Sequence, residues 1–265
     1  MGLKNKIRSI KNKFFSKNVK LDYNYLEYGK LLNDKNAIVF GGATGIGLAI
    51  SNQLYDAGAK VIVCSRTKHN LDSKFDFYPI DLEKDNFIDD LDKLIKKYGK
   101  IDVVINCQGI CPGVDFKQDY MSIDMKDFNS VININLRSVY FINQYFCNYY
   151  IKNKIAGNIL NIASTEGLKG SIVPYGISKS GVVSITKGFG KKMAPYNITV
   201  NGIAPGATAT SMMKIKDNNL NYNYIPSKRM STPNEISNMA LFLVSDMGKN
   251  MTGEVVVIDG GESLL

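Results

Sequence analysis

The stretch Gly41-Gly42-Ala43-Thr44-Gly45-Ile46-Gly47 follows the short apolar run Ala37–Phe40 and precedes a helix expected at Leu48–Tyr55. A short apolar run is typical of a buried parallel strand. Glycines let the backbone turn tightly and approach a ligand, while the helix N-terminus offers free amide groups and a positive dipole end. A plain tight turn is the alternative, but the place of this Gly-x-x-x-Gly-x-Gly stretch between strand and helix favours a pyrophosphate-binding turn.

Outward from this turn, short apolar runs and amphipathic segments alternate along the chain. Further strands are predicted at Val61–Cys64, Phe75–Ile80, Val103–Asn106, Asn158–Ala163, Thr199–Ala204 and Val255–Ile258. Further helices are predicted at Phe87–Tyr98 with Asp85 as its cap, and at Phe128–Tyr150, Tyr175–Ala194 and Glu235–Ser245. This alternation predicts a Rossmann-like, doubly wound α/β fold: one seven-stranded parallel sheet with helices on both faces. Only fourteen residues separate Arg66 from Asp81, so the helix after the second strand is expected to be short or absent.

Composition excludes several classes of protein. The 265 residues are 45% hydrophobic and 22% charged, which are ordinary globular values, and no apolar stretch approaches the roughly 18 residues of a membrane-spanning helix. Cys64, Cys107, Cys111 and Cys147 form no Cys-x-x-Cys pair, and His69 is the only histidine. We therefore expect no metal site, no Ser-His-Asp triad, four free thiols packed as small core residues, and a cytoplasmic location.

The basic charge is concentrated in an N-terminal extension, residues 1–33. Residues 1–20 hold seven lysines and arginines and no acid, so the net charge of +9 falls to +2 for the remaining residues. Nucleic acid is therefore not an expected partner of the body. Leu3, Ile7, Ile10 and Phe14 fall on one helical face. This pattern fits a solvated or partner-docked helix, and alternatively a helix that contacts anionic lipid weakly at the inner face of the membrane.

Two further signals concern chemistry. Tyr175 and Lys179 are four residues apart, which places both on one helix face, where an ammonium group near the phenol would lower the pKa of the tyrosine. Ser65 and Arg66 end the second strand without an acid. An acid there would bind a ribose 2′-hydroxyl and a cation would bind a 2′-phosphate, so Arg66 favours NADP(H) over NAD(H).

Taken together, these stretches resemble the short-chain dehydrogenase/reductase family over about residues 35–263. The matching segments are the glycine turn, Asp81, Asn106-Cys107-Gln108-Gly109, Asn135, Ser164, the Tyr175–Lys179 pair, Pro205–Thr210 and Asp259-Gly260-Gly261. Departures are Phe40, Cys107 and Gln108 at positions where the family has Thr, Asn and Ala, and a short Ser164–Tyr175 spacing that also leaves Thr165 as an alternative to Ser164.

The resemblance implies a single catalytic domain over residues 34–265 and a role for each matched residue. Tyr175 would be the acid/base, Lys179 would hold the nicotinamide ribose, Ser164 would bind the carbonyl oxygen and Asn135 would hold a water. The residues implied to bind the cofactor, besides Tyr175 and Lys179, are Gly41, Thr44, Gly45, Ile46, Gly47, Ser65, Arg66, Asp81, Leu82, Asn106, Gly109, Pro205, Gly206, Thr208 and Thr210.

The same resemblance implies a small carbonyl or alcohol substrate and a homotetramer or homodimer packed through the helices at 128–150 and 175–194. Residues 211–230, with Met212, Met213, Tyr222 and Tyr224, are interpreted either as a substrate lid or as plain packing. Two alternatives stay open: an NAD-dependent alcohol or sugar dehydrogenase of the same family, and a dinucleotide-binding regulatory protein without catalysis.

Overall fold

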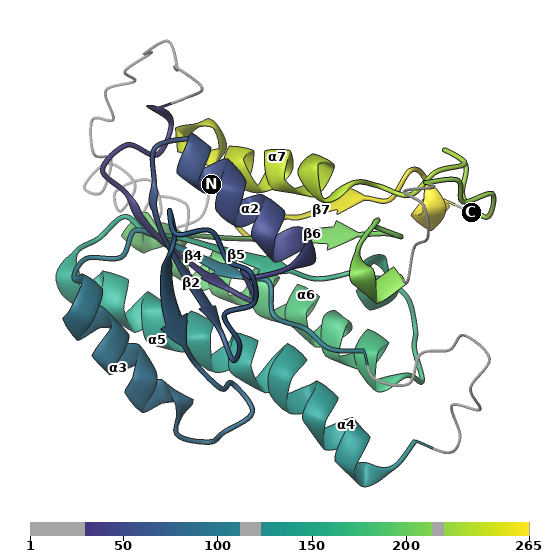
Figure 1. The fold of residues 1–265 in the computed structure, drawn as a ribbon, viewed down its shortest axis with the longest axis horizontal. Helices are drawn as coiled ribbons and strands as arrows, with labels where there is room; N and C mark the ends of the chain where they lie inside the picture. Colours follow the sequence, from purple (N-terminus) through teal and green to yellow (C-terminus); the bar gives the residue numbers. More distant parts are fainter. Residues whose placement is uncertain (1–29, 112–122, 214–219, 265) are drawn as a thin grey trace, which may run out of the picture.

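The computed structural model describes residues 30–111, 123–213 and 220–264, and its centre is one parallel sheet (Figure 1). The strands are β1 (Asn36–Phe40), β2 (Lys60–Ser65), β3 (Asp76–Pro79), β4 (Val103–Asn106), β5 (Asn158–Ile162), β6 (Thr199–Pro205) and β7 (Val255–Ile258). Their order is β3-β2-β1-β4-β5-β6-β7, and every neighbouring pair is parallel. The predicted doubly wound sheet is confirmed.

Helices cover both faces of the sheet. Helices α2 (Gly45–Asp56) and α7 (Pro233–Val244) lie together on one face, and α3 (Phe87–Tyr98), α5 (Ser138–Asn153) and α6 (Pro174–Met193) lie on the other (Figure 1). Successive strand residues alternate between the two layers, as strand geometry requires. In β1, Val39 packs in the core beneath α2 and α7, whereas Ile38 and Phe40 pack in the core beneath α3 and α5.

The predicted helix Phe128–Tyr150 is interrupted. Helix α4 (Met125–Ile132) runs into a π-helical turn, Asn133–Arg137, before α5 begins. A π turn widens the helix by one residue and re-aims the side chains within it. The expected cap of α3 was wrong, because the helix begins after Asn86 and Asp85 pairs instead with Arg137. As expected, no helix stands between β2 and β3.

Strand order reverses between β1 and β4, which places the two loops that follow them side by side. Gly41 donates its amide to Cys64 O across to β2 at 2.8 Å, and Cys107 donates to Phe40 O at 3.0 Å. In parallel sheets, ligands bind outside the carboxyl ends of the strands at such a reversal. The fold therefore brings the glycine turn and the Asn106–Cys111 segment to one edge.

The packed part of the chain reaches back to Leu32, which is 1% exposed and donates its amide to Ala57 O. That is just ahead of the expected domain start at residue 34. The basic segment at residues 1–20 lies outside the described residues. Within the described ranges, no helix is long and apolar enough to cross a membrane.

A glycine between α5 and β5 tests the packing of this layer. A Cβ atom on Gly157 would lie 2.3 Å from the ring of the fully buried Tyr150, whereas one on Gly188, exposed on α6, would meet nothing within 4 Å. We expect Gly157→Ala to lower the free energy of unfolding by about 1–3 kcal/mol through overpacking. Gly188→Ala should raise it by roughly 0.5–1 kcal/mol, because alanine favours the helix. Urea denaturation checks both, and equal stabilities of the two variants would contradict this packing.

Candidate active site

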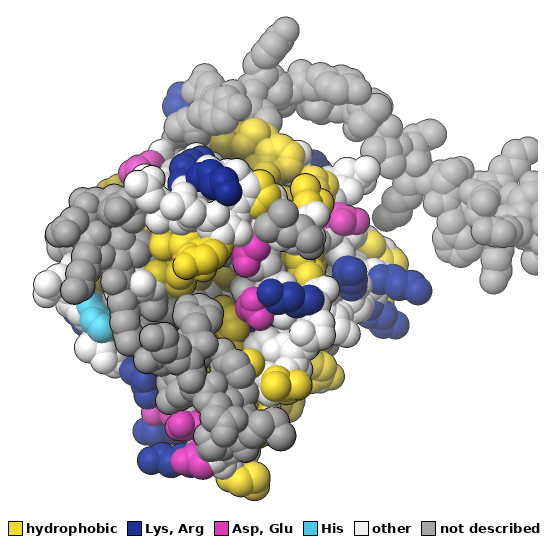
Figure 2. Space-filling view, turned by 90° about the vertical axis from the view of Figure 1, so that its right-hand side faces the viewer, with side chains coloured by type: hydrophobic (Ala, Val, Ile, Leu, Met, Phe, Trp, Pro, Cys, Tyr) yellow, Lys and Arg dark blue, Asp and Glu magenta, His cyan; other side chains and the backbone are white. Residues whose placement is uncertain are grey.

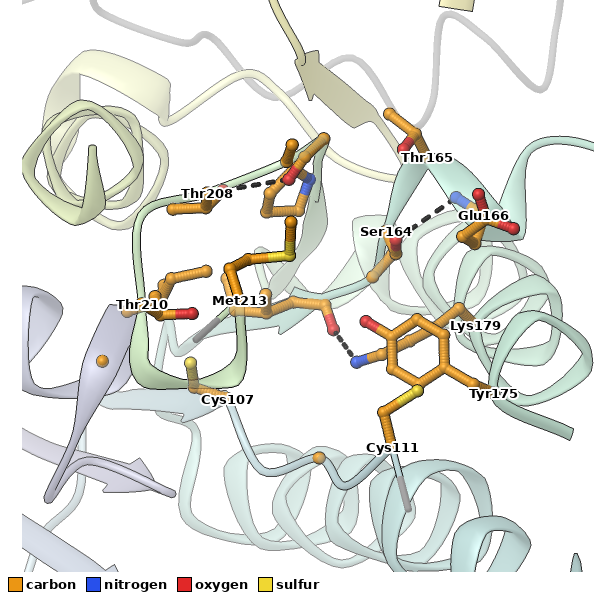
Figure 3. A pocket seen from close by; sticks show the side chains of 18 of the residues that line it. Cys107, Cys111, Ser164, Thr165, Glu166, Tyr175, Lys179, Thr208, Thr210 and Met213 are labelled. Carbon is orange, nitrogen blue, oxygen red and sulfur yellow. Dashed lines mark hydrogen bonds between the residues drawn. The ribbon is translucent and has the colours of Figure 1, made fainter. Parts of the chain in front are cut away.

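A cavity of about 660 Å³ opens at the carboxyl edge of the sheet. Most of the residues expected to bind a cofactor or to act in catalysis line it (Figure 3). These are Gly41, Thr44, Gly45, Ile46, Gly47, Gly109, Ser164, Tyr175, Lys179, Pro205, Gly206, Thr208 and Thr210. The volume is in the range of small-molecule and cofactor sites.

The glycine turn is closed by backbone contacts that exclude side chains. A Cβ on Gly47 would lie 2.1 Å from Gly41 O, and one on Gly41 would lie 2.9 Å from Cys107 O. Gly41 and Gly45 adopt φ angles of 71° and 53°, in the left-handed region that favours glycine. Glycine is therefore required for both the turn and its close approach to the β4 loop.

The N-terminus of α2 is prepared for an anion. Its cap residue, Thr44, makes no side-chain capping bond, and the first turn holds no acidic residue. The first amides of a helix have no acceptor inside the helix. They face the cavity with the positive end of the helix dipole, so this turn fits the pyrophosphate of a dinucleotide.

The Tyr175–Lys179 pair lies at the other end of the cavity, on the first turns of α6, which begins with Pro174 at a position suited to proline. The Lys179 ammonium group lies 5.7 Å from the centre of the Tyr175 ring and donates to Ile162 O at 2.8 Å. Ser164 Oγ accepts from the Glu166 amide at 3.2 Å, and the Ser164 hydroxyl lowers the pKa of Tyr175. Figure 3 shows Ser164 and Tyr175 on the same side of the cavity. Thr165, the alternative to Ser164, also lines the cavity.

Burial dominates the electrostatics of the pair. It raises the pKa of Tyr175 to about 12, against the opposing hydrogen bond from Ser164, and it lowers the pKa of Lys179 to about 8. The expectation that Lys179 would lower the pKa of the tyrosine was therefore wrong for this structure. The cause is desolvation, which disfavours the charged form of each group.

Asn135 lies in the π turn and is fully buried. Its amide group spans the backbone of Ile110, donating to Ile110 O at 2.9 Å and accepting from Ile110 N at 2.8 Å, and it also donates to Ser178 Oγ at 3.2 Å. A Cβ on Gly109 would lie 3.5 Å from Lys179 Nζ and 3.7 Å from Asn135 Oδ1. Asn135 thus fixes the β4 loop against the lysine.

Several expected cofactor residues lie outside the lining of the cavity. These are Ser65, Arg66, Asp81, Leu82 and Asn106. Arg66 is 60% exposed at the end of β2 and lies 3.9 Å from Glu83. Asp81 accepts from the Glu83 amide at 3.1 Å. Asn106 is buried below the site, where it donates to Asn161 at 2.8 Å.

Sequence reasoning missed other residues that line the cavity. Cys111 was expected to be a core residue, and this was wrong, because it lines the cavity; Cys107 packs against the core and also lines the cavity (Figure 3). Cys64 and Cys147 are buried, as expected. Two carboxylates were also missed. They are Glu166 and Glu262. The sequence could have indicated both, because Glu166 stands two residues after Ser164 and Glu262 directly follows Gly260-Gly261.

The segment expected as a lid is partly described. Ser211–Met213 forms a 3-10 turn, and Asn221 pairs with Arg229. Met213 and Tyr222 line the cavity, and residues 214–219 lie outside the described ranges. The exposed histidine, His69, lies on the surface in cyan in Figure 2.

This arrangement of a dinucleotide turn and a buried Ser-Tyr-Lys cluster on one parallel sheet defines an oxidoreductase. Residues 41–263 match the family model described as enoyl-(acyl carrier protein) reductase. The chain belongs to the short-chain dehydrogenase/reductase family.

Among relatives, the 3-oxoacyl-acyl-carrier-protein reductase of Thermotoga maritima is 35% identical over 248 residues, which cover 87% of this chain and 98% of that protein. Among solved structures, ElxO with NADP bound is 27% identical, with a TM-score of 0.76 and coverage of 87% and 99%. The 3-ketoacyl-(acyl-carrier-protein) reductase of Brucella melitensis complexed with NADH is 26% identical, with a TM-score of 0.77 and coverage of 88% and 99%.

The buried ammonium group makes stability depend on pH. Between about pH 8 and 10.5 the unfolded chain holds more protons at Lys179 than the folded protein, so stability rises with pH through this window. We expect the unfolding free energy of the wild type, minus that of Lys179→Met, to rise by about 3 kcal/mol across it. Urea unfolding at four pH values measures the difference, with the exposed Lys187→Met as the control for losing one lysine. A constant difference between pH 8 and 10 would contradict burial of the ammonium.

Proposed function

We propose that this protein is an NADP(H)-dependent oxidoreductase that interconverts a carbonyl compound and a secondary alcohol, with Tyr175 as the acid/base. The observation that carries the proposal is the placement of Ser164, Tyr175 and Lys179 in the same cavity as the uncapped N-terminus of α2. The turn would hold the pyrophosphate of a dinucleotide, and Tyr175 and Lys179 would hold its nicotinamide end. The Pro205–Thr210 segment and Gly109 line the space between.

Bound NADPH supplies the hydride that adds to the carbonyl carbon, which leaves negative charge on the oxygen. Ser164 donates a hydrogen bond to that oxygen and stabilises the charge as it forms. Tyr175, with its raised pKa, is protonated at neutral pH and donates its proton to the same oxygen. The Ser164 hydroxyl then stabilises the phenolate until a proton returns.

Lys179 binds the ribose hydroxyls next to the nicotinamide and remains anchored to Ile162 O. Asn135 fixes the loop at Ile110 and holds a water on the path by which protons reach the lysine. Gly109 keeps side chains out of the space between these two groups. In this assignment Asn135, Ser164, Tyr175 and Lys179 act as one catalytic set.

The preference for NADP(H) rests on Arg66. Its exposed guanidinium stands at the end of β2 and is free to turn toward a 2′-phosphate, since its contact with Glu83 is long and half-exposed. Ser65 lies beside it, with its hydroxyl donating to Thr67 O. Asp81 and Leu82 follow β3 at the same edge and would hold the adenine, while Asn106 supports the β4 loop from below.

The proposal extends to a catalytic domain over residues 34–265 acting as a cytoplasmic homotetramer or homodimer. Partly exposed apolar side chains on the outer helices support an assembly between copies. Examples are Phe128 on α4, Tyr140 and Phe141 on α5, and Ile177 on α6. The basic segment at residues 1–20 adds weak contact with anionic lipid, and the body has no nucleic-acid partner.

Removal of the phenol hydroxyl tests the acid/base assignment. Tyr175→Phe should lower kcat for NADPH-dependent carbonyl reduction by about 10²–10⁴-fold, because proton transfer is lost, while NADPH binding survives. Steady-state kinetics with a carbonyl panel and calorimetry of NADPH binding provide the two measurements. The half-exposed Tyr196→Phe is the matched control and should keep full activity. Unchanged turnover by the Tyr175 variant would favour a regulatory dinucleotide-binding protein.

Calorimetric titration with NADPH and NADH tests the cofactor assignment. We expect tighter binding of NADPH, and Arg66→Ala should weaken NADPH by about 10–100-fold through loss of charge-assisted hydrogen bonds while leaving NADH unchanged. Lys68→Ala, two residues away and also exposed, is the control for losing one positive charge. Equal or reversed preference in the wild type would overturn the assignment and favour the NAD-dependent alternative.

A further inference from the structure

Two carboxylates that the proposed mechanism leaves unused line the active-site cavity. Glu166 stands on the 3-10 turn Thr165–Gly167, directly after Ser164, and Glu262 stands on the 3-10 turn Glu262–Leu264 after β7. They come from segments nearly 100 residues apart. Both line the same cavity from separate segments of the chain.

Glu166 is held firmly at this wall. Its amide donates to Ser164 Oγ at 3.2 Å, and the next residue, Gly167, packs so closely on α6 that a Cβ would lie 2.6 Å from Lys179 O. Glu166 and Tyr175 both line the cavity. The Glu166 side chain is 42% exposed, and its carboxylate pairs with the exposed Lys169 at 2.8 Å.

Glu262 has an oxygen without a partner. Its Oε2 atom is buried and makes no hydrogen bond within the part of the chain that the structure describes. The same atom would lie 2.8 Å from a Cβ on Gly206, so it stands against the Pro205–Thr210 segment. The packing around Gly206 therefore covers this oxygen, while other atoms of Glu262 line the cavity.

Hydroxyl groups complete the polar lining at this end. Besides Ser164 and Tyr175, the side chains that carry them are Thr165, Thr208, Thr210, Ser211 and Tyr222. Apolar contact comes from Val173 and Met213. The Lys179 ammonium is the one positive charge in the described lining, and it already donates to Ile162 O. The described lining thus offers hydroxyl groups that donate and accept, with two carboxylates against one ammonium group.

We propose that Glu166 and Glu262 select the substrate, and that it is a neutral or cationic carbonyl compound bearing hydroxyl or amine donors next to the carbonyl, not one bearing a carboxylate or phosphate there. This assignment rests on the proposed function. Hydroxyl and amine groups can donate to carboxylates of the lining, whereas an anion next to the carbonyl meets like charge.

Three small ketones of similar size separate charge from shape: dihydroxyacetone, hydroxypyruvate and aminoacetone. We expect kcat/KM with NADPH to be about tenfold or more higher for dihydroxyacetone and aminoacetone than for hydroxypyruvate, since like-charge contact is costly. In the double variant Glu166→Gln/Glu262→Gln, the ratio of dihydroxyacetone to hydroxypyruvate should fall to within about threefold of one, as the repulsion is removed.

Glu254→Gln is the matched control, because it removes one exposed carboxylate outside the cavity lining and should leave the ratio unchanged. A wild-type ratio near one, or a ratio unmoved in the double variant, would overturn the inference. The single variant Glu262→Gln tests that residue alone. If it binds NADPH more weakly but keeps the ratio of dihydroxyacetone to hydroxypyruvate unchanged, Glu262 contacts the cofactor, and its role in substrate selection is overturned.

The proposed function can fail without the inference about Glu166 and Glu262 failing. That is the result if NADPH binds but neither these ketones nor an acetoacetyl thioester is reduced. In that case calorimetry of the NADP⁺-loaded protein with glycerol and with glycerate still decides the charge preference. Binding of glycerol but not glycerate, lost in the double variant, supports the inference. Equal binding of both overturns it.

Discussion

The buried ammonium group of Lys179 is the constraint around which the active site is built. A charge removed from water must be compensated by fixed acceptors, and here one is the carbonyl of Ile162 at the end of β5. The bond requires α6 to lie close to the strand ends, and Gly167 and Gly109 allow that approach. The same proximity buries Tyr175 and raises its pKa, so the acid and its neighbour acquire their properties from one packing arrangement.

Below the site, amide side chains take the place of apolar packing. Asn161 on β5 accepts from Asn106 on β4 at 2.8 Å and from Asn143 on α5 at 3.0 Å, and it donates to Thr186 on α6 at 3.0 Å. All four side chains are buried. A satisfied network of this kind has few alternative arrangements, so it fixes the register of two strands and two helices directly beneath the catalytic groups.

The order of strands and helices could be predicted because each element has a recognisable pattern in its own stretch of sequence. Apolar strand runs, glycine stops and the glycine turn specify the parallel sheet, and the spacing of Tyr175 and Lys179 places them on one helix face. What the sequence could not supply were effects of tertiary burial. The π turn at Asn133–Arg137 has no periodic signature, and the high pKa of Tyr175 arises from desolvation. Cys107 and Cys111 line the cavity because they follow the end of β4, and no local pattern in the sequence shows this.

The π turn also has a mechanical consequence. Asn135 within it grips the backbone of Ile110, while Arg137, at its end, donates to Glu83 O at 2.7 Å and pairs with Asp85 in the loop after β3. One five-residue turn therefore contacts both the loop after β3 and the loop after β4. The positions of the two loops are therefore linked through one short segment of backbone.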